Sequence, residues 1–88
     1  MQARIIYLGK IGRNLEGPVI GKLIATFINN CADENCTAVI DCSEVKKMGP
    51  AVLRAAKKYL KKGSKSLVIA IVNANDQVRD FFIGLLCE

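Results

Sequence analysis

Residues 37–63 read TAVIDCSEVKKMGPAVLRAAKKYLKKG, and this stretch decides the fold class. It opens with a β-rich run over Thr37–Cys42 and continues into a predicted helix that begins at Met48-Gly49-Pro50. Proline is favourable there because a first-turn residue has no helical partner for its N–H group. Gly63 is expected to end the helix, since glycine readily adopts the left-handed conformation that follows a helix. A strand joined to a helix by a short link predicts one β-α unit of a parallel sheet.

The same pattern of a strand followed by a helix occurs on both sides of this unit. Upstream, a strand over Arg4–Leu8 precedes a helix that begins at Gly17-Pro18 and is expected to end at Asn29-Asn30. Downstream, Leu67–Val72 is apolar on both faces, as buried parallel strands are, and Asn75 is a favourable N-cap for a third helix. The chain is therefore predicted to be α/β, with three successive β-α units and a small parallel sheet.

Length and composition limit the classes of function. The chain has 88 residues, which corresponds to one domain over residues 1–88. It carries 13 Lys and Arg against 8 Asp and Glu, a formal charge of +5, and it has no His. The lack of His excludes His-dependent acid–base catalysis, Ser-His and Cys-His dyads, and His-ligated metals. No apolar run is long enough to span a bilayer, and the start does not resemble a signal peptide, so we expect a cytoplasmic protein without membrane insertion.

The four cysteines, Cys31, Cys36, Cys42 and Cys87, do not have the paired spacing of a zinc site. A cytoplasmic protein keeps its thiols reduced, and no His is available to activate a catalytic Cys. We therefore expect small buried hydrophobic residues with one or two free thiols, and neither a metal nor a cofactor.

The loop after the first strand is rich in glycine but lacks the spacing of phosphate-binding motifs. Gly12 and Gly17 are one residue off the P-loop spacing, and Pro18 stands where the phosphate-binding lysine would be. Asp41 lies at the carboxyl end of the second strand, where α/β proteins bind ligands, but the other strand ends supply Leu8 and Val72. We expect Asp41 to cap the following turn, and the chain to have no catalytic residues and no enzymatic activity.

Basic residues are concentrated in the second half of the chain. No acidic residue occurs between Val45 and Asn75, but eight basic ones do: Lys46, Lys47, Arg54, Lys57, Lys58, Lys61, Lys62 and Lys65. Helical geometry predicts that five of them share one side of the second helix, namely Arg54, Lys57, Lys58, Lys61 and Lys65. This stripe is either a solvated helix face or a docking surface for an acidic partner, which would be a protein, nucleic acid or anionic lipid. Lysine exceeds arginine and no aromatic residues alternate with them, which disfavours base-specific readout.

Ala38–Val45, with the sequence AVIDCSEV, resembles the V-x-D-x-S-x-V strand of STAS domains of the anti-sigma-factor-antagonist type. Ile5–Ile11 is similar to an earlier strand of that family, and Leu67–Leu86 is similar to its ending. The resemblance covers nearly the whole chain in order and spacing, although the usual N-terminal strand and the last strand and helix of longer members are missing. It implies helices mainly on one face of the sheet and a non-enzymatic regulatory module that binds other proteins.

The resemblance also implies where a partner would bind. In the family, the loop before the second helix and the exposed face of that helix meet the partner; the matching residues here are Lys47, Met48, Gly49, Pro50, Arg54, Lys57 and Lys58. These residues imply a protein partner with an acidic surface. The serine that a cognate kinase phosphorylates in the family would fall within Gly49–Val52, where no hydroxyl exists, so Ser43 is the nearest candidate phosphosite.

A second resemblance supports an alternative function. Lys61–Ala70 and Leu85–Glu88 are similar to the L7Ae-type family, which binds kink-turn RNA. That family begins the preceding helix with G-x-N-E, whereas this chain has Gly49-Pro50-Ala51-Val52. The alternative is therefore a small basic RNA-binding α/β module.

The predicted strands are apolar on both sides, which bears on self-association. Alternate residues of the third strand face opposite sides. One side carries Leu67, Ile69 and Ile71, and the other carries Val68, Ala70 and Val72. In the first strand, Ile5 and Tyr7 likewise oppose Ile6 and Leu8. If the helices cover one face, the other is a contiguous apolar patch, and we expect a two-fold homodimer to bury it. Helices on both faces, as in doubly wound folds, would instead favour a monomer.

Overall fold

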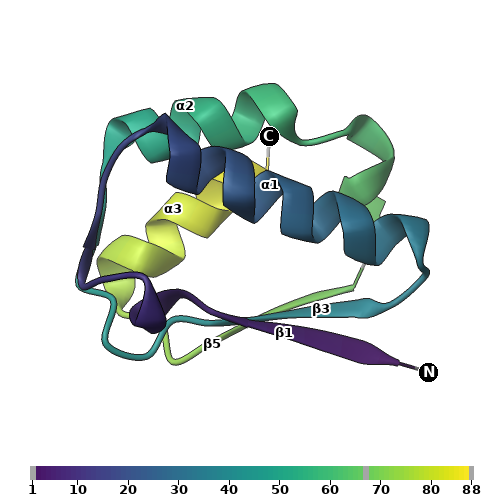
Figure 1. Cartoon of the computed structure of the whole chain (residues 1–88), viewed down its shortest axis with the longest axis horizontal. Coiled ribbons are helices and arrows are strands. Elements are labelled where there is room, and N and C mark those ends of the chain that lie inside the picture. The colour runs from purple at the N-terminus through teal and green to yellow at the C-terminus, as the bar shows by residue number, and fades with distance from the viewer. Residues whose placement is uncertain (1, 67, 88) are drawn as a thin grey trace.

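The computed structural model of the chain describes residues 2–66 and 68–87 (Figure 1). Its strands are β1 (Ala3–Tyr7), β2 (Asn14–Leu15), β3 (Thr37–Asp41), β4 (Lys47–Met48) and β5 (Ile69–Val72). Its helices are α1 (Pro18–Asp33), α2 (Pro50–Tyr59) and α3 (Asp76–Leu86), with short 3₁₀ turns at Leu8–Lys10 and Lys62–Ser66. Leu67, the first residue of the predicted third strand, lies outside the described residues.

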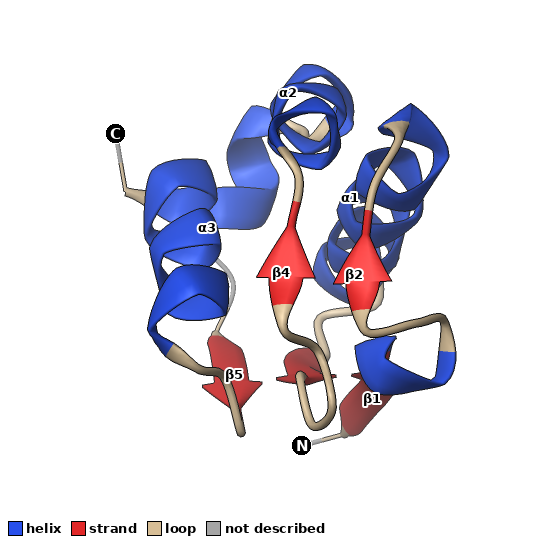
Figure 2. Ribbon diagram, turned by 90° about the vertical axis from the view of Figure 1, so that its left-hand side faces the viewer, coloured by secondary structure: helices blue, strands red, loops and turns tan. Residues whose placement is uncertain are grey.

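The main sheet is parallel and has the strand order β1-β3-β5. Its register aligns Ile6 with Ile40 and Ile40 with Ile71, so that a row of isoleucines crosses the inner face. α1, α2 and α3 all lie on that side of the sheet (Figures 1 and 2). The predicted fold class, with three β-α units, a small parallel sheet and helices mainly on one face, is confirmed.

A second parallel pair, β2 with β4, was not predicted from the sequence. Asn14 aligns with Lys47 and Leu15 with Met48. Figure 2 shows that these two strands lie side by side and lead to the starts of α1 and α2. Strands this short carry no hydrophobic periodicity, so only the tertiary structure reveals them. The pair places the two helix starts next to each other.

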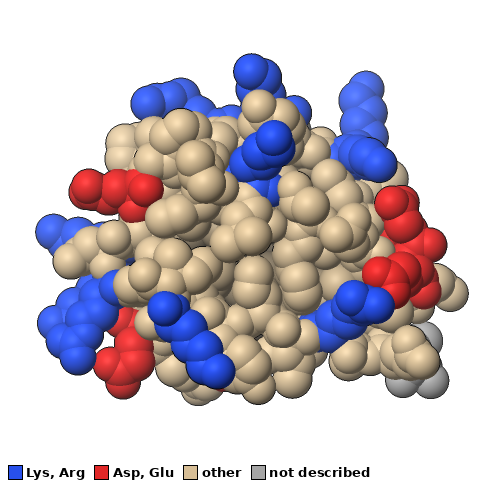
Figure 3. Space-filling view, viewed as in Figure 1, with Lys and Arg blue, Asp and Glu red and all other residues tan. Residues whose placement is uncertain are grey.

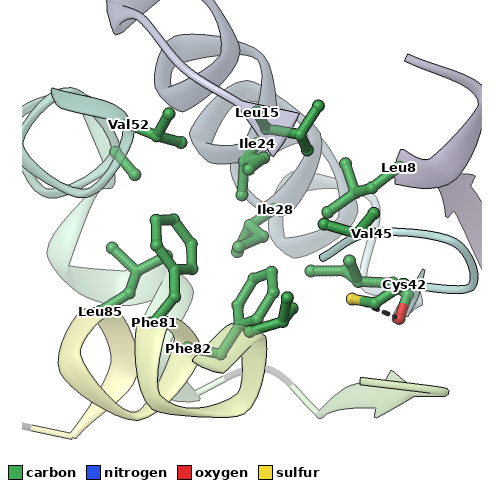
Figure 4. Packing of buried hydrophobic residues seen from close by; sticks show 13 residues of the cluster. Leu8, Leu15, Ile24, Ile28, Cys42, Val45, Val52, Phe81, Phe82 and Leu85 are labelled. Carbon is green, nitrogen blue, oxygen red and sulfur yellow. Dashed lines mark hydrogen bonds between the residues drawn. The ribbon is translucent and has the colours of Figure 1, made fainter. Parts of the chain in front are cut away.

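The hydrophobic core lies between the main sheet and the helices (Figure 4). Leu8 and Leu15 come from the segment before α1, Ile24 and Ile28 from α1, and Val52 from α2; all are almost fully buried. α3 completes the core with Phe81, Phe82 and Leu85. The prediction that Asn75 caps α3 is confirmed, because its side chain accepts a hydrogen bond from the Val78 N–H group at 2.9 Å.

α1 and α2 pack backbone against backbone at Gly21. A Cβ atom at this position would lie 2.2 Å from the carbonyl oxygen of Val52 and 2.8 Å from the Cβ of Ala55. No larger residue fits without moving a helix, because the nearest atoms belong to the α2 backbone. Gly21 therefore sets the spacing of the two helices.

α1 continues past its expected end at Asn29-Asn30 and ends at Asp33. Asn35 adopts the left-handed conformation with φ 56°, and the N–H groups of Asn35 and Cys36 donate to the carbonyls of Ala32 and Cys31. This arrangement is a Schellman motif, which satisfies carbonyls at the end of the helix. The helix-ending asparagine is thus Asn35.

Asn29 instead lies buried within α1, where its side chain holds the end of α2. Its Nδ2 donates to the carbonyl of Tyr59 at 2.9 Å. Its Oδ1 accepts from the Lys61 N–H at 3.0 Å and from the Ser64 hydroxyl at 2.7 Å. The prediction that α2 extends to Gly63 was wrong, since α2 ends at Tyr59. The residues that follow leave the helix and hydrogen-bond to the Asn29 side chain.

Most of the cysteines are buried, as expected for small hydrophobic residues. Cys31, Cys36 and Cys42 are buried, Cys87 is exposed, and all four are free thiols. Burial raises the pKa of Cys42 to about 11, so this thiol stays protonated and packs as a small hydrophobic residue. None of the helices in residues 2–66 and 68–87 has the length and apolar character needed to cross a membrane.

Candidate functional site

A groove runs along the outer surface between the start of α1 and the length of α2. It has a volume of about 320 Å³ and is lined by Pro18, Ala51, Arg54, Ala55, Lys58 and Tyr59. The groove exists because Gly21 brings the helix backbones together and the alanines of α2 leave little side-chain volume between them. We call this feature the α1/α2 groove.

The rim of the α1/α2 groove is positively charged. Arg54 and Lys58 are exposed on its α2 side, and Lys22 of α1 lies with its Nζ 5.2 Å from the centre of the Tyr59 ring. Lys58 contacts the same ring, with its Nζ at 5.5 Å. In the described part of the chain, no carboxylate forms an ion pair with Arg54, Lys58 or Lys22. In Figure 3, basic side chains along the upper edge over α2 have no acidic side chain beside them, whereas the visible acidic side chains lie at the two ends of the molecule, where basic ones are also present.

An aromatic side chain is exposed beside these cations, since Tyr59 lines the groove and is 41% exposed. Val19 and Leu23 are also exposed on α1, at 79% and 44%, but they do not line the groove. Isolated apolar side chains are common on protein surfaces, whereas Tyr59 lies in a groove with a charged rim. Such a combination suits a protein segment that carries both apolar and acidic side chains.

The structure brings together only part of the partner surface predicted from the sequence. Arg54 and Lys58 line the groove, but Lys57 is exposed on the other flank of α2. On that flank Leu53, one turn before Lys57, faces Gly84 of α3. Lys57 therefore points away from the groove.

The predicted residues before α2 occupy several different environments. Lys47 is exposed on β4, whereas Met48 is half-buried and packs against the core. Gly49 is the N-cap of α2, and its N–H donates to the carbonyl of Leu15 at 2.8 Å. Pro50 is exposed at the first turn, so Lys47 and Pro50 are the accessible members of this group.

The expected stripe of five basic residues along α2 was wrong beyond Lys58. α2 ends at Tyr59, so Lys61 follows the helix, and its Nζ lies 3.9 Å from the carboxylate of Asp33. The side chain of Lys65 lies outside the part of the chain that the structure describes. The groove is instead lined by Pro18 and Tyr59, and Lys22 lies at its rim. None of these three residues was predicted from the sequence. The Gly-Pro sequence that begins both helices is the signal that could have indicated that their starts lie side by side.

Asp41 organises a separate cluster at the carboxyl end of β3. One of its oxygens accepts from the Ser43 N–H at 2.9 Å, the Ser43 hydroxyl at 2.7 Å and the Asn73 side-chain amide at 3.3 Å. These bonds, led by the one from the Ser43 hydroxyl, hold the pKa of Asp41 below its ordinary value. The prediction that Asp41 caps the following turn is confirmed.

The glycine-rich loop and Ser43 lie beside Asp41 in the same cluster. A Cβ at Gly9 would lie 1.9 Å from the carbonyl oxygen of Ser43, so this glycine permits a close contact between two loops. Tyr7, Lys10 and Glu44 complete a shallow hollow of about 220 Å³ around them. Ser43 is exposed, but its hydroxyl already donates to Asp41, and a phosphate there would meet the negative charge of that carboxylate. Phosphorylation of Ser43 stays a prediction.

Comparison of the chain with protein-family models, with curated proteins and with solved structures finds no match in any of the three. A functional proposal therefore rests on the sequence resemblance, the fold and the residues of the site.

Proposed function

We propose that this chain is a non-enzymatic, STAS-like regulatory module that binds another protein, and that the partner presents an acidic surface to the α1/α2 groove. The observation that carries this proposal is the position of Arg54 and Lys58 on the rim of a partly apolar groove, without a carboxylate partner in the described residues. Lys47 and Pro50, exposed just before and at the start of α2, extend the same surface.

The charges and the apolar groups would contribute in different ways. Exposed cations attract an acidic partner and raise its association rate more than its final affinity. Tyr59 and Arg54 belong to the residue types that most often dominate binding energy when a partner removes them from water. We therefore expect a partner segment in which one or two apolar side chains enter the groove and carboxylates face Arg54 and Lys58.

The fold also supports the proposal. The arrangement of all three described helices on one face is the one that the STAS resemblance implies. The Gly49–Val52 segment, which has no hydroxyl, lies at the start of α2 beside the groove. Docking at this surface is therefore not switched by phosphorylation of that segment, in contrast to the family pattern.

The experiment is affinity capture from an extract of the source cells with three forms of the protein. These are the wild type, the double variant Arg54→Glu/Lys58→Glu, and the control Lys57→Glu. The control reverses a charge in the same helix turn as Lys58 but outside the groove. We expect the double variant to lose the partner and the control to keep it. With the captured partner in hand, calorimetry should show at least about tenfold weaker binding for the double variant, about 1.4 kcal/mol.

Three outcomes would replace the proposal. If ribonuclease abolishes capture and the complex weakens steeply as salt is raised, the chain is the basic RNA-binding module, because phosphate contacts release counterions. If Lys57→Glu weakens binding as much as the double variant, the partner covers both exposed flanks of α2 and not the groove alone. Equal binding by all forms would show that the basic residues form only a solvated face.

A further inference from the structure

The outer face of the main sheet is apolar and uncovered. The register places Ile5, Val39 and Ala70 in one row across the three strands, and Tyr7 and Val72 flank Asp41 in the next row. Ile5 is 50% exposed and Tyr7 47%, and Val68, just before β5, is 64% exposed. All-parallel sheets normally have both faces covered, yet here the helices cover one face (Figure 2).

The charge of this face determines what can bind to it. Among its described strand residues, Asp41 is the one charged side chain, and Ser43 and Asn73 satisfy it at the carboxyl end. At the same end, Lys10 of the following 3₁₀ turn places its Nζ 5.0 Å from the centre of the Tyr7 ring. The charged groups therefore lie at the carboxyl end, and the row of Ile5, Val39 and Ala70 in the middle of the face carries none. It is suited to an apolar, uncharged protein surface.

We propose that this face binds the same face of a second copy of the chain, which forms a two-fold dimer with the sheets stacked. A two-fold contact places the same patch on both sides, so apolar rows meet apolar rows. The dimer would be a four-layer assembly, with the two helix layers outside. Both faces of each parallel sheet would then be covered.

The cations around the α1/α2 groove do not oppose this contact. Arg54, Lys58 and Lys22 belong to the helix layer, on the far side of each sheet. With sheets about 10 Å apart and a helix layer about 10 Å thick on each, these cations of the two copies lie on the order of 30 Å apart. That distance exceeds the screening length of about 8 Å at physiological salt.

The size of the face indicates a weak and reversible dimer. Three strands about 4.8 Å apart and about five residues long cover on the order of 230 Å². Stable interfaces bury about 800 Å² on each partner, so this much smaller face should hold a dimer only at high protein concentration. Dimer formation thus depends on the concentration of the protein.

Sedimentation equilibrium between about 5 and 500 µM tests the proposal, with a reducing agent present because Cys87 is an exposed free thiol. We expect the mass of the wild type to rise from 9.6 kDa towards twice that value. The variant Ile5→Glu should weaken association at least tenfold. The control Ile83→Glu introduces the same charge at an equally exposed position, 50%, on α3, and should dimerise like the wild type.

The design separates the proposed interface from general effects. Each variant lowers the net charge from +5 to +4, so loss of the dimer cannot come from greater overall repulsion. If circular dichroism shows that Ile5→Glu does not fold, Val68→Glu replaces it, because Val68 precedes the strand and is more exposed. A wild type that stays monomeric at about 500 µM overturns the proposal. So does a dimer that survives the sheet-face variant, or one that Ile83→Glu disrupts equally.

Discussion

The outer surface of the helix layer and the outer face of the sheet differ in both charge and construction. The α1/α2 groove has a rim of cations, Arg54, Lys58 and Lys22, around partly exposed apolar groups. The outer rows of the sheet are apolar, with Asp41 as the charged residue among their described positions. These surfaces lie on opposite sides of the molecule, so the two proposed contacts would not overlap (Figure 1).

The two surfaces also differ in what maintains them. The sheet face is fixed by repeated backbone pairing along β1, β3 and β5, which no single side chain controls. The groove depends on two local contacts, the packing of Gly21 against α2 and the hydrogen bonds of Asn29 to the end of α2. Single substitutions should therefore damage the groove far more readily than the sheet face.

The largest effect is expected from Gly21→Val. Its side chain would meet the α2 backbone at Val52 and Ala55, so the helices would have to separate. We expect a loss of roughly 4 kcal/mol in the free energy of unfolding, more than ordinary overpacking, because backbone atoms cannot rotate away. Urea denaturation followed by circular dichroism measures this loss.

The control for this substitution is Gly84→Ala in α3. A Cβ there would lie 3.6 Å from Leu53, an ordinary van der Waals distance. Alanine is a better helix former than glycine, so stability should rise by up to about 1 kcal/mol. If Gly21→Val were tolerated as well as Gly84→Ala, the groove would not depend on close helix packing.

A smaller loss of stability is expected from Asn29→Ala. The substitution leaves the Tyr59 carbonyl, the Lys61 N–H and the Ser64 hydroxyl without their partner. Unpaired groups of this kind cost about 1–3 kcal/mol, and we expect about 2 kcal/mol in total because part of the region can reach water. Asn30→Ala, at an exposed position of the same helix, should change stability by less than about 0.5 kcal/mol.

The Asn29 variant also tests the comparison between the two surfaces. Affinity for the acidic partner should fall, since Tyr59 lies at the end of the groove that Asn29 fixes. Self-association through the sheet should remain, because the outer rows do not contact this region. Equal damage to both properties would show that the surfaces are energetically coupled.

The smallest effect concerns the charge at the rim of the sheet face. Hydrogen bonds from Ser43 and Asn73 lower the pKa of Asp41. A lowered pKa in the folded state stabilises the fold above the ordinary value of about 3.9, and this contribution is lost as the pH falls through the lowered pKa. Carbon-13 NMR of the carboxyl group should show Asp41 titrating below about pH 3.9 in the wild type and closer to that value in Ser43→Ala. Identical midpoints in the two proteins would contradict the role given to Ser43.

Local sequence patterns predicted the elements of the fold well, but not all of their ends. The β-rich run at Thr37–Cys42 and the Gly-Pro helix starts correspond to β3, α1 and α2. Asn29 misled the prediction because an asparagine can end a helix or bridge a neighbouring one, and only the packing of α1 on α2 distinguishes these roles. The two-residue strands β2 and β4 were missed because pairing, and not composition, creates them.

The candidate site could be predicted only in part for the same reason. Arg54 and Lys58 stood out because they lie in a run of basic residues that lacks acids. Lys57 belongs to the same run, yet helix rotation places it on the other flank of α2. Lys22 lies far away in the chain and joins the site because Gly21 allows α1 to approach α2.

The sequence by itself determined the order of the three main strands and the helices, the excess of basic residues, the lack of His and the apolar character of both sides of the strands. These properties depend on residue type and on spacing within single elements. The tertiary structure decided which apolar side stays exposed, which cations share a groove and where α2 ends. Those properties depend on contacts between residues distant in the chain, and local periodicity specifies which face of an element is buried but not which element will cover it.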